Sequence, residues 1–263
     1  MSVSIKSEHE IELMRHAGHL LEKVHDELAS HIRPGISTKE LDRIGEDMIR
    51  SMGCTPNFLN YEGFPASFCI SLNDEVVHGI PSRHKIIQEG DLVKIDAGLI
   101  YKGYHSDAAR TYAVGEVSPE ARQLMEVTKQ SFFEGIKMAK EGQHLHDISR
   151  AIEEYVTPYG YGIVRDLVGH GIGTALHEDP QIPNYAQKRR GVRLQAGMTL
   201  AIDTMINASL VAIEINNCLP SMETPRGTED YEGFYHLISM QGEVGEAKLN
   251  YIVRDHDKNG FEE

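Results

Sequence analysis

Apolar residues recur every three or four positions in four stretches of the chain, which is the spacing of helices that bury one face. The first two stretches each begin with a serine followed three residues later by a glutamate, a pattern typical of helix starts. A proline and a glycine follow the first stretch and predict its end. The sequence therefore predicts helices from Ser7 to Arg33, from Ser37 to Gly53, from Pro119 to about Lys140 and from His146 to Val156.

Shorter apolar runs with other spacing predict strands. Residues 93–111 read as two strands joined by a tight turn near Tyr101-Lys102-Gly103. Further strands are expected over residues 163–168 and 198–207. Residues 58–74 mix aromatic residues with turn formers, which is typical of loops and strands that line a pocket.

Each strand of the predicted hairpin carries one aspartate, Asp96 or Asp107. If the turn centres between Tyr101 and Lys102, the two aspartates face each other with Cβ atoms roughly 4.5–5.5 Å apart. Two carboxylates at that distance repel unless one is protonated or a cation lies between them. The pair therefore indicates either a divalent-metal site or an exposed hairpin whose aspartates point into water.

An internal repeat connects this hairpin with a later part of the chain. At a constant offset of 107 residues, Gly35 matches Gly142, and the segment 90–96 matches the segment 197–203. The same offset places Asp203 at the strand position that Asp96 occupies. We therefore expect two related halves, about residues 1–115 and 116–263, within one domain, and Asp203 should enter the same site as Asp96.

Composition narrows the range of functions. The 263 residues carry 26 Lys and Arg against 40 Asp and Glu, a formal net charge of −14, so no basic face for nucleic acid is expected. No apolar run approaches the length of about 18 residues that spans a membrane, and the first ten residues lack a signal-peptide pattern. Three cysteines without a CxxC pair are typical of reduced thiols in a cytoplasm.

His170 lies in a glycine-rich run, Gly169-His170-Gly171-Ile172-Gly173. A histidine among glycines is often only a turn residue, but other groups can approach it closely because its neighbours lack side chains. Together with Asp96, Asp107 and Asp203 it would form an oxygen-rich set with one nitrogen, which suits Mn, Fe, Co or Zn. Two ions that share such ligands can generate a nucleophile from water at neutral pH.

His78 and His177 lie in loop-like segments, Val77-His78-Gly79 and Leu176-His177-Glu178. Either histidine could bind substrate or stabilise a developing oxyanion. Each could equally be an exposed or capping histidine, and the residues alone leave both readings open.

Five stretches of the chain resemble the bacterial-type methionine aminopeptidases, which are metallopeptidases of the pita-bread fold. They are Pro34–Asp42, Cys69–Pro81, the hairpin with Asp96 and Asp107, Gly169–Pro180, and Gly197–Asn207. The resemblance is close over about residues 5–208 and weak afterwards. It implies an α+β fold of two pseudo-symmetric halves around a central metal site.

The resemblance also implies an activity and a set of site residues. The activity is removal of the N-terminal methionine from nascent proteins by a cytoplasmic monomer close to the ribosome, with up to two divalent cations (Co, Mn, Fe, Zn or Ni). Asp96, Asp107 and His170 match three of the family's metal ligands, and His78 and His177 match its substrate-contacting histidines. Tyr61, Phe64, Cys69 and Leu176 would line the methionine pocket.

Two positions depart from the family pattern. Asp203 replaces a ligand glutamate that also serves as general base, which shortens its reach by about 1.5 Å. Leu249 stands where the fifth ligand, another glutamate, is expected. The second metal position is therefore weakened. The departures leave two hypotheses, an impaired and mononuclear aminopeptidase or an inactive relative that still binds peptides. A prolidase-like activity is a third, which the match over Cys69–Pro81 disfavours.

Overall fold

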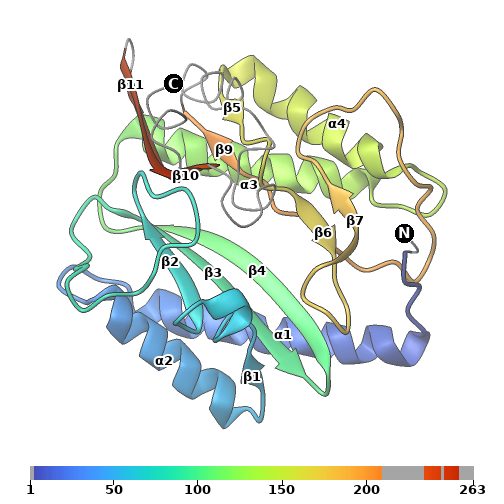
Figure 1. The fold of residues 1–263 in the computed structure, drawn as a ribbon, viewed down its shortest axis with the longest axis horizontal. Helices are drawn as coiled ribbons and strands as arrows, with labels where there is room; N and C mark the ends of the chain where they lie inside the picture. Colours follow the sequence, from blue (N-terminus) through green and yellow to red (C-terminus); the bar gives the residue numbers. More distant parts are fainter. Residues whose placement is uncertain (1–2, 209–233, 244–245, 255–263) are drawn as a thin grey trace.

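The computed structural model describes residues 3–208, 234–243 and 246–254, and Figure 1 shows their arrangement. The helices α1 and α2 lie on one side of the molecule and α3 and α4 on the opposite side, with most of the strands between them. No helix in the described ranges is long and apolar enough to cross a membrane. The helices are α1 (Glu8–His31), α2 (Thr38–Ser51), η1 (Tyr61–Gly63), α3 (Pro119–Met138), α4 (Leu145–Val156) and η2 (Thr157–Tyr159). The strands are β1 (Thr55–Pro56), β2 (Phe68–Leu72), β3 (Leu92–Tyr101), β4 (Tyr104–Ala113), β5 (Gly162–Ile163), β6 (Gly169–Gly171), β7 (Glu178–Ile182), β8 (Leu200–Ala201), β9 (Ile206–Asn207), β10 (Phe234–Glu243) and β11 (Glu246–Arg254).

The four predicted helices are present, and local chemistry explains their starts. The Ser7 side chain accepts the Glu10 N–H, and the Glu10 carboxylate accepts the Ser7 N–H in return, which satisfies two N–H groups that the first turn leaves free. Ser37 caps α2 by accepting the Glu40 N–H. Helix α3 ends two residues earlier than expected, at Met138.

The first sheet has the order β1-β3-β2, with β4 paired to β3. Alternate residues of β3 are fully buried in the core with the apolar stripe of α1, so the intervening residues, Asp96 among them, point to the other face. This period of two places the aspartates away from the helices. The buried residues are Val93, Ile95, Ala97 and Leu99 from β3 and Ala17, Leu21, Val24 and Leu28 from α1.

The register of the hairpin corrects the prediction that Asp96 and Asp107 face each other. The turn residues are Lys102 and Gly103, both with positive φ, and Asp96 faces Ala109 while Asp107 faces Gly98. Gly98 lies two residues after Asp96, so the aspartates are diagonal neighbours on one face of the sheet. They still lie close together, since burial and, next, the Asp107 charge raise the pKa of the Asp96 carboxyl.

Hydrogen bonds repeat at the offset of 107 residues. The Gly35 N–H donates to Ile87 O at 2.8 Å, and the Gly142 N–H donates to Leu194 O at 3.0 Å. Two isolated bridges, Ser37 with Ile86 and His144 with Arg193, have the same spacing. These equivalent bonds support the proposal that the chain is built from two related halves.

The segments that lead into α1 and α3 also occupy related places. The Gly90 N–H donates to Val114 O, in the segment that enters α3. The repeat partner of Gly90 is Gly197, whose carbonyl accepts the Lys6 N–H, in the segment that enters α1. Gly90 and Gly197 both have a left-handed φ near +90°, which favours glycine. The turn at Gly197 is therefore covered by the segment that enters α1, whereas the turn at Gly90 is closed by the residues that continue the β3–β4 pairing.

Two predicted strands are wrong in extent. Only Ile163 of residues 163–168 is in a strand, and the next strand begins at Gly169, because Arg165 and Asp166 form an exposed bend. The strand expected over residues 198–207 is split into β8 and β9. β8 pairs with β6 and β9 pairs with β5, so the chain changes partner between Ala201 and Ile206.

A substitution at Gly45 of α2 tests how tightly α2 packs against β2. A Cβ atom there would lie 2.5 Å from Cζ of the fully buried Phe68. We expect Gly45→Ala to lower the free energy of unfolding by about 1–3 kcal/mol through overpacking, despite alanine's better helix propensity. The control is Gly18→Ala in α1, where the nearest atom lies 3.9 Å away, so alanine should stabilise by up to about 1 kcal/mol. Urea unfolding of both variants measures the difference, and equal effects would contradict the packing.

His25 makes the fold sensitive to acid. Its ring is fully buried between α1 and β4, where Nε2 lies 2.9 Å from Ala108 O and Nδ1 lies 3.1 Å from the Tyr112 hydroxyl. Burial lowers its pKa from the ordinary 6.5 to about 4. The neutral ring therefore stabilises the fold above pH 6.5, and this stabilisation, about 3 kcal/mol, is lost as the pH falls from 6.5 towards 4.

We expect His25→Gln to reduce the dependence of the unfolding free energy on pH across this range, because the amide does not titrate. His19→Gln is the control on the same helix, since the His19 side chain is 67% exposed. A wild-type slope in the His25 variant would show that this histidine does not control the acid response.

Candidate metal centre

His170 lies in β6, the central strand of the sheet β7-β6-β8. A Cβ atom on Gly169 would lie 2.5 Å from Ala201 O, and one on Gly171 would lie 2.2 Å from Asp179 O. The glycines are therefore required because the backbones of both neighbouring strands pass close to β6. His170 Nδ1 lies 2.8 Å from Gly171 O, so Nδ1 carries the proton and Nε2 presents its lone pair to the site.

Nε2 of His170 points between two carboxylates from different elements. It lies 3.6 Å from Asp107 Oδ2 of β4 and 3.7 Å from Asp203 Oδ2, which follows β8. These distances are too long for hydrogen bonds, but they suit two ligands of one ion that each lie about 2.0–2.2 Å from it. In addition, Asp107 Oδ1 is buried and has no hydrogen-bond partner. The three side chains therefore fit a divalent cation.

Asp96 adds a third carboxylate beside Asp107. Burial, followed by the nearby charges of Asp107 and Asp203, raises the pKa of Asp96 well above its ordinary value. The pKa of Asp203 rises to about 7, chiefly through burial and then through the Asp107 charge, while His170 opposes the rise. Crowded carboxylates of this kind are stabilised by a cation.

The pKa of His170 is also raised, but in this case burial acts against the rise. Burial disfavours its protonated form, but the nearby carboxylates of Asp107 and Asp203 and the hydrogen bond to Gly171 O outweigh burial and raise its pKa. The site thus attracts positive charge at the point where Nε2 and the carboxylates converge.

Asn184 holds the backbone at Asp203. Its fully buried side chain donates from Nδ2 to Asp203 O at 2.5 Å, at the point where the chain leaves β8. Asn184 was not predicted as a site residue, since no sequence motif marks it. Its fixed amide determines where the Asp203 backbone lies and therefore where its carboxylate can reach.

His177 lies beside the three-residue cluster, on the loop before β7. Its ring packs edge-on against His170 with centroids 4.4 Å apart. Its Nδ1 lies 2.8 Å from the hydroxyl of Tyr61, which η1 brings from the other half of the sequence. The structure therefore brings together three predicted residues, His170, His177 and Tyr61. His78 has a left-handed φ of 57° in the loop between β2 and β3.

Three of the four predicted pocket residues share one buried apolar cluster next to this site. Phe64, Cys69 and Leu176 pack together, and burial raises the pKa of the Cys69 thiol, so the thiol stays protonated and apolar. Tyr61, the fourth, contacts His177 instead. Phe58, from the stretch expected to line a pocket, also belongs to the cluster, and its remaining members, Met14, Ile172 and Ala201, were not predicted.

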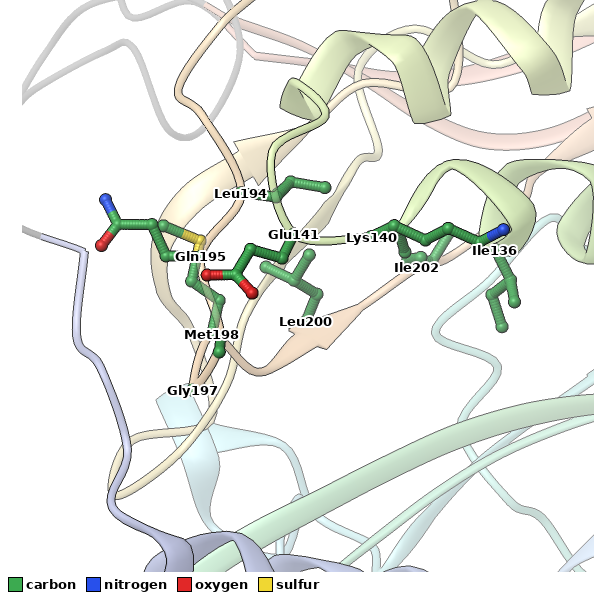
Figure 2. Close-up of a pocket in the computed structure, with 11 residues that line it drawn as sticks. Ile136, Lys140, Glu141, Leu194, Gln195, Gly197, Met198, Leu200 and Ile202 are labelled. Carbon is green, nitrogen blue, oxygen red and sulfur yellow. The ribbon is translucent and has the colours of Figure 1, made fainter.

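A separate cavity of about 410 Å³ lies on the other side of β8 (Figure 2). Leu200 and Ile202 line it, whereas the alternating residues Ala201 and Asp203 belong to the apolar cluster and the metal cluster. Figure 2 shows Glu141 and Met198 at the same cavity. The strand thus separates this cavity from the candidate metal centre.

Leu249 lies in β11, where its backbone pairs with Met240 of β10. Its side chain lies outside what the structure describes. The tail over residues 209–263 is predicted to diverge from the family, and of this tail only the backbone of β10 and β11 is described. The expectation that no carboxylate completes the site from Leu249 stays a prediction.

Comparison with known proteins agrees with this arrangement. The sequence profile of metallopeptidase family M24 matches residues 12–220. The chain belongs to metallopeptidase family M24. A methionine aminopeptidase from Clostridium acetobutylicum is 49% identical over 212 residues, covering 81% of this chain and 85% of the relative. Methionine aminopeptidase 1 from Bacillus subtilis is 48% identical over 203 residues, covering 77% and 82%.

Solved structures of similar proteins share this fold. A methionine aminopeptidase from Rickettsia prowazekii superposes with a TM-score of 0.77 at 38% identity, covering 79% of this chain and 84% of that one. A prolidase from Pyrococcus furiosus gives 0.65 at 27% identity, covering 76% and 57%. The M24 chain described here therefore has the pita-bread fold, and its family implies a divalent metal.

Asp107→Asn tests the metal centre without an activity assay. Without metal, the variant should be no less stable than the wild type, because it removes the charge that repels Asp96 and Asp203. With Mn²⁺, the wild type should gain thermal stability, whereas the variant should bind about 10–100-fold more weakly or worse and gain less. Scanning calorimetry with and without Mn²⁺ measures both effects.

Asp47→Asn is the matched control, since this aspartate is exposed and pairs only with Arg43 among the contacts of the described chain. It should keep the full stabilisation by Mn²⁺. An Asp107 variant that kept it as well would exclude Asp107 as a ligand.

Proposed function

We propose that this M24 protein is a metal-dependent aminopeptidase that removes the N-terminal methionine from nascent proteins. The observation that supports this proposal most directly is the cluster of Asp107, His170 and Asp203, in which the buried Asp107 Oδ1 has no hydrogen-bond partner. The apolar cluster and His177 lie next to it, so an apolar side chain and the adjacent peptide group could be held at the same time. The names of the similar aminopeptidases support this reading.

We assign metal binding to Asp96, Asp107, His170 and Asp203. A bound divalent cation (Co, Mn, Fe, Zn or Ni) supplies Lewis-acid polarisation and lowers the pKa of water. The chain's own task is to fix the ligands. The Gly171 carbonyl sets the His170 tautomer, and Asn184 fixes the backbone at Asp203.

The substrate contacts follow from the neighbours of the cluster. His177 would donate a hydrogen bond from Nε2 to the substrate carbonyl when Nδ1 accepts the Tyr61 hydroxyl proton. His78 would contact the substrate from the N-terminal half. Phe64, Cys69 and Leu176 would enclose the methionine side chain, since thioether and apolar groups pack well together. Tyr61 would close the pocket beside His177.

Asp203 and Leu249 are the reason to expect reduced turnover. The shorter Asp203 side chain would serve as both ligand and general base, and Leu249 offers no carboxylate, so the second metal position would be weak or absent. An inactive protein that binds N-terminal peptides is the alternative that Leu249 favours. We further propose a single domain acting as a cytoplasmic monomer on nascent chains, near the ribosome.

Release of methionine from the peptide Met-Ala-Ser tests the proposal. We expect turnover that EDTA abolishes, that Mn²⁺ or Co²⁺ restores, and that His170→Ala reduces by at least about 100-fold through loss of a ligand. Peptide binding without turnover would establish the inactive alternative. Cleavage of an X-Pro dipeptide in place of Met-Ala-Ser would instead indicate prolidase chemistry.

A further inference from the structure

We propose that the ion pair between Lys6 and Glu178 is a positioning element for His177. Lys6 belongs to the segment that enters α1, and Glu178 directly follows His177 at the start of β7. The inference rests on the proposed function, because it gives His177 a substrate to contact.

The ion pair is buried. The side chain of Lys6 is 4% exposed and that of Glu178 is 15% exposed, and the ammonium group contacts the carboxylate Oε2. Taking two charges out of water is unfavourable, so a buried pair contributes little net stability compared with apolar residues of the same volume. A buried ion pair can instead favour one conformation over others. Here that conformation is the one of the loop that carries His177.

Contacts transmit this geometry to His177. Glu178 Oε1 accepts the Ala175 N–H at 3.2 Å, so the glutamate closes the loop on both sides of His177. The His105 N–H of β4 donates to Gly173 O at 2.8 Å and fixes the start of the same loop. The loop is thus held by Lys6 and His105, both outside it, while His177 projects towards His170 and Tyr61.

The backbone leaves room for Lys6. A Cβ atom on Gly173 would lie 2.5 Å from Lys6 Cε, and one on Gly197 would lie 2.7 Å from Lys6 O. The Lys6 N–H donates to Gly197 O at 2.8 Å. Figure 1 shows the N-terminal segment reaching from α1 to the C-terminal half, and Figure 2 shows it passing Gly197. Lys6 is therefore fixed at its backbone and at its ammonium group.

Removal of the Lys6 charge would leave the Glu178 carboxylate buried and unpaired, so Glu178 would turn towards water and displace the loop. His177 would then lose its position against His170 and Tyr61. The candidate ligands Asp96, Asp107 and His170 lie in strands and Asp203 follows β8, all outside the loop over residues 173–178, so metal binding should persist.

The experiment compares Lys6→Met with Lys6→Arg in the full chain. The methionine keeps the side chain's length without its charge, and the arginine keeps the charge. Lys137→Met is the matched control, because it removes a lysine from the exposed pair with Glu134. The first readout is the ring resonances of His177 in NMR spectra, assigned with His177→Asn, and it does not depend on activity. The second is kcat and KM for Met-Ala-Ser with Mn²⁺.

We expect Lys6→Met to shift the His177 resonances, leave those of His25 in place, and lower kcat about 10–100-fold while Mn²⁺ affinity is retained. Lys6→Arg should restore the resonances and most of kcat. Lys137→Met should match the wild type in both. If Lys6→Met does not fold, Glu178→Gln replaces it, since the amide keeps the size of the side chain without its charge.

Unchanged His177 resonances in a folded Lys6→Met protein would overturn the proposal, as would parallel losses of stability, Mn²⁺ affinity and kcat in Lys6→Met and Lys6→Arg. A wild type that releases no methionine overturns the proposed function alone. The His177 resonances then still decide the role of Lys6.

Discussion

Mutual repulsion of buried carboxylates is the constraint on which this structure depends. Asp107 and Asp203 converge on His170, and Asp96 lies beside Asp107. Burial, followed by the charges of the neighbouring carboxylates, raises the pKa values of Asp96 and Asp203. Carboxylates in such a place destabilise a protein unless a cation or a proton compensates them.

The two halves contribute different chemistry to the site. The N-terminal half supplies a regular hairpin, whose period of two puts Asp96 and Asp107 on the face opposite α1. The C-terminal half supplies short, interrupted strands, in which His170 is held by close backbone contact and Asp203 lies where β8 ends. A long regular strand fixes the direction in which its side chains point. The breaks between the short strands of the C-terminal half let the chain change its pairing partner and turn a side chain in a new direction.

Much of the fold could be predicted from the sequence because helix caps and apolar spacing act locally. The capping of α1 by Ser7 and the stripe that includes Leu21 and Leu28 are examples. The hairpin register could not be fixed, because a shift of the turn by one residue, to Lys102-Gly103, changes the partner of every residue in the ladder. The break after β8 was also missed, and the contact found there, from the Asn184 side chain to Asp203 O, joins positions 19 residues apart that no local pattern connects.

The site itself was predicted through residue types and motifs, and the structure brings Asp107, His170 and Asp203 together. The residues that support them were not found. Lys6 reaches Glu178 across 172 positions of sequence, and no local pattern marks a lysine that will be buried by a distant loop. Such contacts depend on how the halves pack and not on any one segment.

The position of Lys6 in the chain bears on the order in which the native contacts can form during synthesis. Its N–H donates to Gly197 O and its ammonium group contacts Glu178, so both partners are made long after Lys6 itself. Closing a loop of that length costs conformational entropy, and long-range contacts form only once the intervening chain can offset it through packing. The segment before α1 therefore leaves the ribosome well before the residues that it contacts, and it is among the last to reach its native place.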